Sequence, residues 1–315
     1  MCTLPALSSA YFRYWVLNGG EHEKDEMRRL VNRLPITRIK IFIARLLYRL
    51  VHLVFRRDQR IITRKGITYE IDLSEGIDLS VFLFGRFQKH VAGNKLLSLR
   101  EDAVIFDVGA NFGVMTLQYA KLAPLGKVYS FEPTYYAFSK LKRNVQLNPE
   151  LGERIVAVQS FVSSRTSANT DIKAYASWKV GGAVQDVKHS VHGGIAKATQ
   201  GIGAVSLDDF CEKEGIKRLD FIKIDTDGHE FEVLKGAEKV IARFRPTVIF
   251  EVGLYTMEEK NVDFSDYLNF FGSLDYSLFN SSNLRKIDAK NYCKHIPSKG
   301  TIDILALFCP PYEDS

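Results

Sequence analysis

The sequence predicts an α/β fold in which helices cover a mostly parallel sheet. Between residues 103 and 251, short apolar runs alternate with longer amphipathic segments. This alternation is typical of parallel sheets, because a crossover helix joins each strand to the next. The apolar fraction of 46% supplies a sizeable core. The 315 residues are enough for one such domain and an extension.

Residues 1–58 are expected to form a helical extension to a domain that spans 59–315. Residues 36–55 follow the helix period and are apolar almost all round, with one narrow basic stripe made by Arg38, Arg45, Arg49, His52 and Arg56. Two interpretations stay open. The helix packs on the domain with its arginines in water, or it lies in a membrane interface with the stripe toward anionic headgroups.

Neither a transmembrane span nor a secretory signal is expected. No apolar stretch is both long and free of charge, and the first 20 residues lack a basic start and a clean apolar core. The widely spaced Cys2, Cys211, Cys293 and Cys309 have no zinc-ligand spacing and are expected to be reduced thiols. We therefore expect a cytoplasmic protein, with peripheral membrane contact through residues 36–56 left open.

The basic charge is confined to the beginning of the chain. Of the 43 Lys and Arg and 37 Asp and Glu, the first 60 residues hold 12 and 5, which leaves 31 and 32 for the remainder. A nucleic-acid enzyme is expected to carry a basic face on its main domain. We therefore expect no nucleic-acid partner.

The elements follow from apolar periodicity and from turn residues. A hairpin is expected over 60–64 and 66–73 with its turn at Lys65-Gly66, followed by a helix or loop over 77–90. Strands are expected at 103–107, 127–131, 154–160, 219–225, 246–251, 277–279 and 302–308, the last two as a pair. Helices are expected at 114–122, 134–148, 205–213, 229–244 and 263–271. Residues 162–204, rich in Ser, Thr, Gly and Lys, break the rhythm and predict an insertion or lid.

Two strand ends predict a ligand site. The first strand runs into Asp107-Val108-Gly109-Ala110-Asn111-Phe112-Gly113, where Gly109 allows a close backbone approach and Gly113 lets the helix start near the strand. The second strand ends in Phe131-Glu132-Pro133, and Glu132 follows Asp107 at about the spacing from which an acid reaches a ribose diol. Asp107 is placed to accept from a cationic amine.

The stretch from 107 to 251 resembles class I S-adenosylmethionine-dependent methyltransferases and, within them, the FkbM family. In that family the Asp-Val-Gly-Ala-Asn-x-Gly turn cradles the methionine part of the cofactor, and the acid after the second strand holds the ribose. The resemblance implies a Rossmann-like sheet of seven strands with an antiparallel last strand. It also implies S-adenosyl-L-methionine as cofactor, bound by Asp107, Gly109, Ala110, Asn111, Gly113, Glu132, Pro133 and Ser160.

The resemblance continues in two later motifs. The first is Val205-Ser206-Leu207-Asp208-Asp209-Phe210 and the second runs from Asp220 to Glu230. The family's usual form of the second is similar to Asp-x-x-Lys-x-Asp-x-Glu-Gly-x-Glu, so that Asp227 stands where Glu is usual. Lys223 alternates with isoleucines along the strand, and an internal ion pair is expected for it.

The catalytic residues are expected at the end of the fourth strand. A hydroxyl acceptor has to lose its proton, and Asp225 is the best placed base, with His229 and Glu230 at the start of the next helix. Asp225, Asp227 and Glu230 together have the chemistry of a cation site. We nevertheless expect a site without metal.

The sequence therefore predicts an O-methyltransferase that acts on a hydroxyl of a sugar, a glycan or a polar natural product. One alternative is a membrane-associated enzyme for a lipid-linked glycan. Another is a non-catalytic S-adenosylmethionine-fold scaffold protein at a membrane surface. A nicotinamide-dependent oxidoreductase is disfavoured, because the turn at 109–113 lacks the Gly-x-Gly-x-x-Gly spacing.

Overall fold

A computed structural model describes most of the chain and divides it into two compact units. The described residues are 13, 14, 16, 20, 37–85, 88, 91, 94, 99–168, 170, 172, 174–176, 180, 195–197, 199, 201–298 and 300–309. One unit comprises residues 1–87 and 177–195, and the other 88–176 and 196–315. The proposed division into residues 1–58 and 59–315 stays a prediction.

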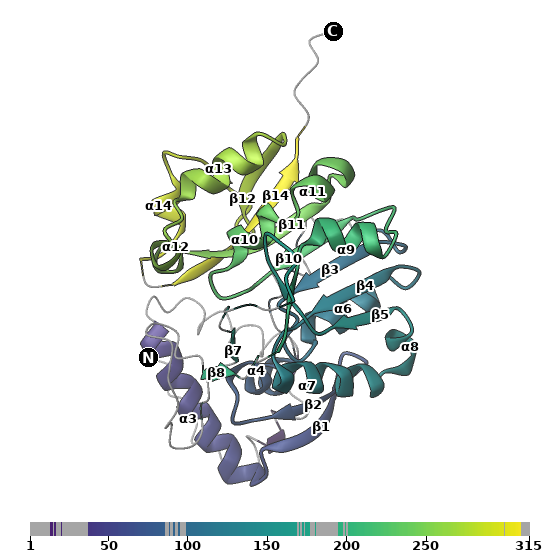
Figure 1. Ribbon diagram of the computed structural model, residues 1–315. Coiled ribbons are helices and arrows are strands. Elements are labelled where there is room, and N and C mark those ends of the chain that lie inside the picture. The colour runs from purple at the N-terminus through teal and green to yellow at the C-terminus, as the bar shows by residue number, and fades with distance from the viewer. Residues whose placement is uncertain are drawn as a thin grey trace. The chain divides into compact units, whose positions relative to one another are not determined.

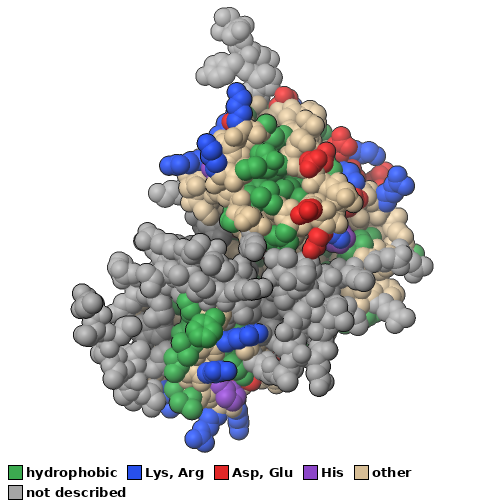
Figure 2. All heavy atoms as spheres, turned by 90° about the vertical axis from the view of Figure 1, so that its left-hand side faces the viewer, with side chains coloured by type: hydrophobic (Ala, Val, Ile, Leu, Met, Phe, Trp, Pro, Cys, Tyr) green, Lys and Arg blue, Asp and Glu red, His purple; other side chains and the backbone are tan. Residues whose placement is uncertain are grey.

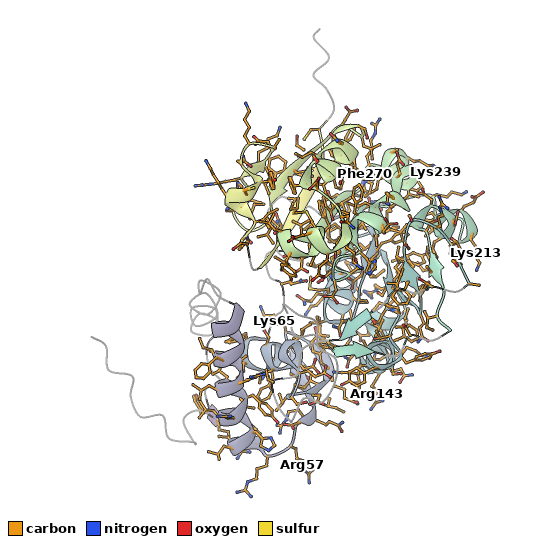
Figure 3. The ribbon with its side chains drawn as sticks, turned by 60° about the vertical axis from the view of Figure 1, so that its left-hand side comes forward. Arg57, Lys65, Arg143, Lys213, Lys239 and Phe270 are labelled. Carbon is orange, nitrogen blue, oxygen red and sulfur yellow. The ribbon has the colours of Figure 1, made fainter. Side chains whose placement is uncertain are left out.

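The first unit holds the expected helix and hairpin. Its elements are α3 (Thr37–Phe55), β1 (Gln59–Arg64), β2 (Ile67–Asp72) and α4 (Gly76–Phe84). β1 and β2 pair antiparallel around a turn that holds Lys65, labelled in Figure 3, and Gly66. The φ angles of these two residues, 52° and 74°, are those of a tight two-residue hairpin turn. The hairpin predicted from the Lys-Gly pair is therefore confirmed.

α3 is attached to this unit along one side. Val51 is fully buried, the Tyr48 hydroxyl donates to Asp58 Oδ2 over 3.0 Å, and the Phe55 ring meets Phe82 of α4 edge-on. The packed-helix interpretation therefore holds for this side of α3. No helix in the described part of the chain is long and apolar enough to cross a bilayer.

The second unit is built on one mixed sheet (Figure 1). In spatial order its strands are β13 (Lys286–Ile287), β12 (Tyr276–Asn280), β14 (Thr301–Phe308), β11 (Thr247–Gly253), β10 (Phe221–Ile224), β3 (Val104–Val108), β4 (Lys127–Phe131) and β5 (Ile155–Val158). The five strands from β11 to β5 are parallel, and β14 runs antiparallel between β11 and β12. The predicted sheet of seven strands is confirmed, and the structure adds the short β13 at its edge.

Helices flank this sheet (Figure 1). They are α6 (Val114–Leu122), α7 (Tyr135–Gln146), α8 (Pro149–Gly152), α9 (Leu207–Lys213), α10 (Glu230–Lys235), α11 (Glu238–Phe244), α12 (Leu254–Lys260), α13 (Phe264–Gly272) and α14 (Tyr292–His295). Ser206 caps the start of α9, since its side chain accepts from the Asp209 amide. Edge-on contacts of the Phe210 ring with Phe106 and Phe131 close the core beneath the strand ends.

The predicted helix 229–244 is wrong as one element, because it breaks into α10 and α11. The Gly236 carbonyl accepts from the Asp208 amide, and the Asp208 carboxylate in turn accepts from the Val240 amide of α11. A Cβ at Gly236 would lie 2.1 Å from the Ser163 carbonyl oxygen. The break therefore comes from tertiary partners that the helical period does not contain.

Within 162–204 the structure describes only short pieces. β6 (Phe161–Val162) pairs with β9 (Ala204–Val205), and β7 (Ala174–Ala176) forms a two-stranded sheet with β8 (Ile195–Lys197). Most of the remaining segment lies outside the described residues. Its role as a lid stays a prediction.

Candidate functional site

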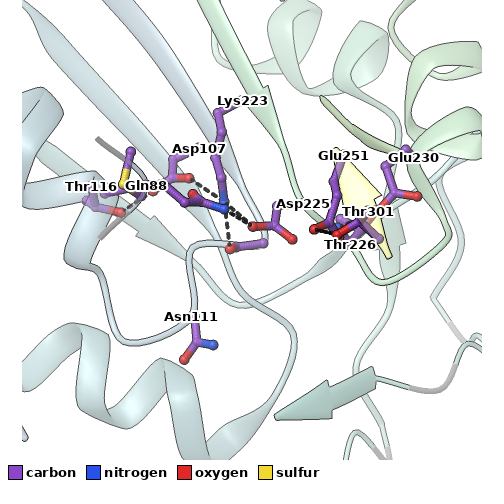
Figure 4. A network of polar contacts seen from close by, with 12 residues as sticks. Gln88, Asp107, Asn111, Thr116, Lys223, Asp225, Thr226, Glu230, Glu251 and Thr301 are labelled. Carbon is purple, nitrogen blue, oxygen red and sulfur yellow. Dashed lines mark hydrogen bonds and ion pairs between the residues drawn. The ribbon is translucent and has the colours of Figure 1, made fainter. Parts of the chain in front are cut away.

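Asp107 is buried at the end of β3, where its carboxylate has two neighbours. Oδ2 accepts from the Thr116 hydroxyl over 2.6 Å, and Oδ1 lies 3.6 Å from Lys223 Nζ (Figure 4). Burial raises the pKa of Asp107, while Lys223 and Thr116 oppose that effect. The cationic amine expected at Asp107 is therefore supplied within the protein by Lys223.

Lys223 connects β3 to the end of β10. Its register partner on β3 is Asp107, and its Nζ lies 3.2 Å from Asp225 Oδ2 and donates to the Gly109 carbonyl oxygen over 3.4 Å. Burial lowers the pKa of Lys223, but the charges of Asp225 and Asp107 outweigh burial and raise it. Lys223 is therefore a buried ammonium that ties the two aspartates together, as the predicted internal ion pair required.

Gln88 is a site residue that sequence reasoning missed. Its Nε2 donates to Asp225 Oδ2 over 3.1 Å, so that this oxygen contacts both Gln88 and Lys223. Gln88 has a φ of 44°, a left-handed conformation that is uncommon outside glycine. It lies outside every motif of the sequence, and no local signal distinguishes it.

The turn after β3 is a close-packed backbone structure. Gly109 and Gly113 have φ angles of 78° and 88°, and Asn111 adopts a φ of 50°. A Cβ on Gly109 would lie 1.8 Å from the Asp225 carbonyl oxygen, and one on Gly113 would lie 2.5 Å from Leu141 Cδ1. Gly109 is therefore required for contact between two turns of the protein itself.

Glu132 fastens this turn to the end of β4. Its Oε2 accepts from the Asn111 amide over 3.0 Å, and its Oε1 accepts from the amide and hydroxyl of Thr134. Burial raises the pKa of Glu132, and these hydrogen bonds act in the opposite direction. A carboxylate has about four acceptor positions, so that three bonds leave capacity for a ligand hydroxyl.

The turn after β10 has a similar plan. Glu230 is buried, and its Oε1 accepts from the amide and hydroxyl of Thr226 and from the Gly228 amide. Asp227 and Gly228 in this turn have φ angles of 53° and 100°. Burial is the main cause that raises the pKa of Glu230. In this geometry Glu230 holds the loop.

Two titratable groups of this turn have shifted pKa values. Burial and the nearby carboxylates of Asp225, Glu230 and Glu132 raise the pKa of Asp227 to about 8. Burial and the ammonium of Lys260 lower the pKa of His229 to about 4. Lys260 Nζ lies 3.1 Å from His229 Nε2. Since an ammonium has no lone pair, Nε2 is the acceptor in this contact and His229 is neutral.

A pocket with about 500 Å³ of open space lies where these strand ends meet. Its lining includes six of the predicted site residues, Gly109, Glu132, Pro133, Ser160, Asp225 and His229, together with Thr226 and Asp227. The rest of its described lining is apolar: Val108, Phe131, Phe161, Val162 and Ile172. Predicted residues outside the described lining are Asp107, Ala110, Asn111, Gly113 and Glu230, which build the two turns behind it.

The lining fits a nucleoside cofactor. Ligand pockets are typically apolar, with a few convergent polar groups that fix the orientation. Here aromatic and aliphatic side chains offer contacts to a base, and Glu132 offers acceptor capacity to a diol. Among the described residues, no group of three His, Cys, Asp or Glu is arranged to hold a metal ion.

Comparison with known proteins assigns the same region to one family. The profile of the Methyltransferase FkbM domain matches residues 107–278. The 2-O-methyltransferase NoeI of Sinorhizobium fredii is 26% identical over 167 residues, which cover 48% of this chain and 65% of NoeI. The hexuronic acid methyltransferase AglP of Haloferax volcanii is 28% identical over 136 residues, 43% of this chain and 50% of AglP. The chain thus spans less than two thirds of either relative.

Among solved structures, the methyltransferase FkbM of Methylobacillus flagellatus KT matches with a TM-score of 0.45 and 17% identity. That match covers 72% of this chain and 52% of the other.

Proposed function

The chain belongs to the FkbM methyltransferase family, and on this premise we propose that it is an S-adenosylmethionine-dependent O-methyltransferase. One observation carries the proposal. A single pocket at the carboxyl ends of β4 and β10 is lined by Glu132 on one side and by Asp225 and His229 on the other. Ligands of open α/β sheets bind at this edge.

On the cofactor side, Glu132 is proposed to bind the ribose hydroxyls, with Gly109, Pro133 and Ser160 against the ligand. The turn behind the pocket lining is fixed in shape by four further residues, Asp107, Ala110, Asn111 and Gly113. When bound, S-adenosylmethionine supplies a methyl group already activated on a sulfonium. The protein's contribution is then largely to hold the acceptor in line with that methyl group.

On the acceptor side, Asp225 and His229 are proposed to contact the reacting hydroxyl, while Glu230 keeps their turn in shape. The acceptor class is proposed from the relatives, since NoeI is named a 2-O-methyltransferase and AglP a hexuronic acid methyltransferase. We therefore propose a hydroxyl of a sugar, a glycan or a polar natural product as the acceptor. Nucleic acid is not among the proposed partners.

Calorimetric titration with S-adenosylhomocysteine tests the cofactor site. We expect binding to the wild type and to Glu150→Ala, a control at an exposed carboxylate, and its loss in Glu132→Ala. A folded wild type that does not bind would contradict the proposal. Binding without turnover on any sugar or glycan would instead favour the non-catalytic scaffold alternative.

A second proposal concerns location, a cytoplasmic protein in peripheral contact with an anionic membrane. The observation that favours it is the outer face of α3, on which Phe42, Leu46, Leu50 and Leu53 are 68%, 49%, 43% and 73% exposed. At helical spacing, exposed arginines such as Arg45 and Arg49 lie in the neighbouring row. Figure 2 shows such green and blue side chains together in its lower part. Apolar and basic rows side by side are typical of interfacial helices.

Sedimentation with vesicles tests this location. We expect pelleting with vesicles that contain phosphatidylserine but not with neutral ones, and its loss when Leu46 and Leu53 are both changed to Ser. Leu125→Ser is the matched control, since Leu125 is 75% exposed in the other unit. Failure of the wild type to pellet at low salt would contradict membrane contact, and a concentration-dependent dimer would show that a second copy covers this face.

A further inference from the structure

Asp227 occupies the strained position of the turn that borders the pocket. It lines the pocket between Asp225 and His229, and its φ is 53°. A non-glycine residue in this conformation is strained, and such strain concentrates at functional sites. The three hydrogen bonds accepted by Glu230 on either side of Asp227 hold the turn in this shape.

The three acids that line the pocket differ in their partners. Glu132 accepts three hydrogen bonds, and Asp225 Oδ2 contacts both Lys223 Nζ and Gln88 Nε2. The carboxyl of Asp227 makes no hydrogen bond or ion pair with the part of the chain that the structure describes. Donors and a neighbouring cation stabilise a carboxylate and weaken it as a base. Of the three, Asp227 is the acid with neither carboxyl oxygen in a hydrogen bond or ion pair with the described residues.

We infer that Asp227 is the general base of the reaction and that Asp225 is the anion that Lys223 holds beside it. The inference rests on the proposed methyltransferase function. The acceptor oxygen bonds to the methyl carbon as the carbon–sulfur bond breaks, and sulfur keeps that electron pair. The hydroxyl proton passes to the Asp227 carboxylate and then to water. The products are a methyl ether and S-adenosylhomocysteine.

The surroundings of Asp227 suit a base that works near neutral pH. The titratable groups around it are Lys223 of β10, Asp225 directly after that strand, Glu132 at the end of β4, His229 and Glu230 at the start of α10, and Tyr255 of α12. Burial and the surrounding carboxylates raise its pKa to about 8, and only Lys223 opposes them. A base is most effective when its pKa lies near the working pH. A bound sulfonium would lower this pKa, because a nearby cation favours the carboxylate.

The test compares Asp227→Asn, Asp227→Glu and Asp225→Asn in the full-length protein. We expect Asp227→Asn to lower kcat by about 100-fold or more, with the affinity for S-adenosylhomocysteine changed by less than about threefold. Its residual rate should lose the rise with pH that the wild type shows. Asp227→Glu should restore much of the rate, because it returns a carboxylate to the same turn.

A readout independent of turnover is the carboxyl titration of Asp227, followed by carbon NMR in the free protein. We expect a midpoint near 8 that is absent from Asp227→Asn. The inference is overturned if Asp227→Asn keeps the wild-type rate and pH profile, or if Asp225→Asn alone abolishes the pH-dependent rise. A wild type that binds no S-adenosylhomocysteine overturns the proposed function itself, a result that calorimetry separates from loss of the base.

Discussion

The turns after β3 and β10 share one plan, but the side chain of the left-handed residue is paired in the first turn and unpaired among the described residues in the second. Each places a non-glycine residue in the left-handed region, Asn111 with φ 50° and Asp227 with φ 53°, ahead of a glycine with positive φ. In each, a buried glutamate accepts turn amides, Glu132 for the first turn and Glu230 for the second. The Asn111 side chain accepts from the next amide, whereas the Asp227 carboxyl has no partner among the described residues.

The difference indicates that the two turns have different roles. A turn whose polar groups are paired with one another is fixed in one shape and suits ligand binding. A turn that keeps one carboxyl unpaired at a pocket carries a cost in stability and gains a group able to accept a proton. Substitutions in the first turn are therefore expected to weaken ligand binding, and substitutions in the second turn are expected to lower turnover.

The largest expected effect on stability comes from a substitution that breaks the contact between the two turns. Gly109→Ala would place a Cβ 1.8 Å from the Asp225 carbonyl oxygen at a positive φ, and we expect it to lower the free energy of unfolding by about 3 kcal/mol. Denaturant unfolding measures this. The control Gly272→Ala, where no atom lies within 4 Å of the added Cβ, should change stability by less than about 1 kcal/mol. A stable Gly109→Ala protein would show that the turns do not touch in solution.

The next effect should separate binding from folding in the first turn. Glu132→Gln keeps the shape but removes the charge that accepts the Asn111 amide, and we expect it to weaken S-adenosylhomocysteine binding about 10- to 100-fold. Calorimetry measures the dissociation constant, with Glu150→Gln as the exposed control. Unchanged affinity would assign the ribose to another group.

A smaller effect sharpens the contrast between Asp225 and Asp227. Folding raises the pKa of Asp227 from 3.8 to about 8, so that between these values the folded protein binds a proton that the unfolded chain has released. The contribution of Asp227 to the free energy of unfolding therefore falls as pH rises from 3.8 to about 8. We expect Asp227→Asn to raise the free energy of unfolding by about 1–2 kcal/mol at about pH 8 and by almost nothing at about pH 4.

Asp225→Asn is the matched comparison for that measurement, by denaturant unfolding at both pH values. It removes a carboxylate 3.2 Å from the buried Lys223 ammonium and should destabilise the protein at about pH 8. The same sign for both variants at that pH would contradict the division of roles proposed for the two aspartates.

The smallest expected effect concerns the pKa of His229, the last residue of the turn after β10. Lys260→Met removes one of the two causes that lower the pKa of His229 to about 4, while burial remains. We expect that pKa to rise by no more than about one unit, because the exposed Lys260 is screened by solvent. Proton NMR of the histidine ring measures it, with Lys290→Met as the distant control. An unchanged midpoint would show that the contact between Lys260 and His229 does not form in solution.

Much of the fold could be read from local pattern. The strands β3, β4, β10 and β11 lie within about two residues of their expected ends, since a buried apolar run and its flanking turn residues are both local signals. The helix 229–244 could not be read in this way, because its break at Gly236 depends on Asp208, which is distant in sequence.

The sequence by itself determined the order of strands and helices, the two glycine-bearing turns and the acids that line the pocket, because periodicity, turn residues and motif spacing are properties of neighbouring residues. Only the tertiary structure decided which of these acids are engaged in hydrogen bonds or ion pairs. That Lys223 faces Asp107, that Gln88 donates to Asp225, and that Gly109 touches the Asp225 carbonyl all depend on strand register and on burial. The pairing state of a carboxylate, and with it the pKa, depends on partners far away in the chain, and no local pattern encodes it.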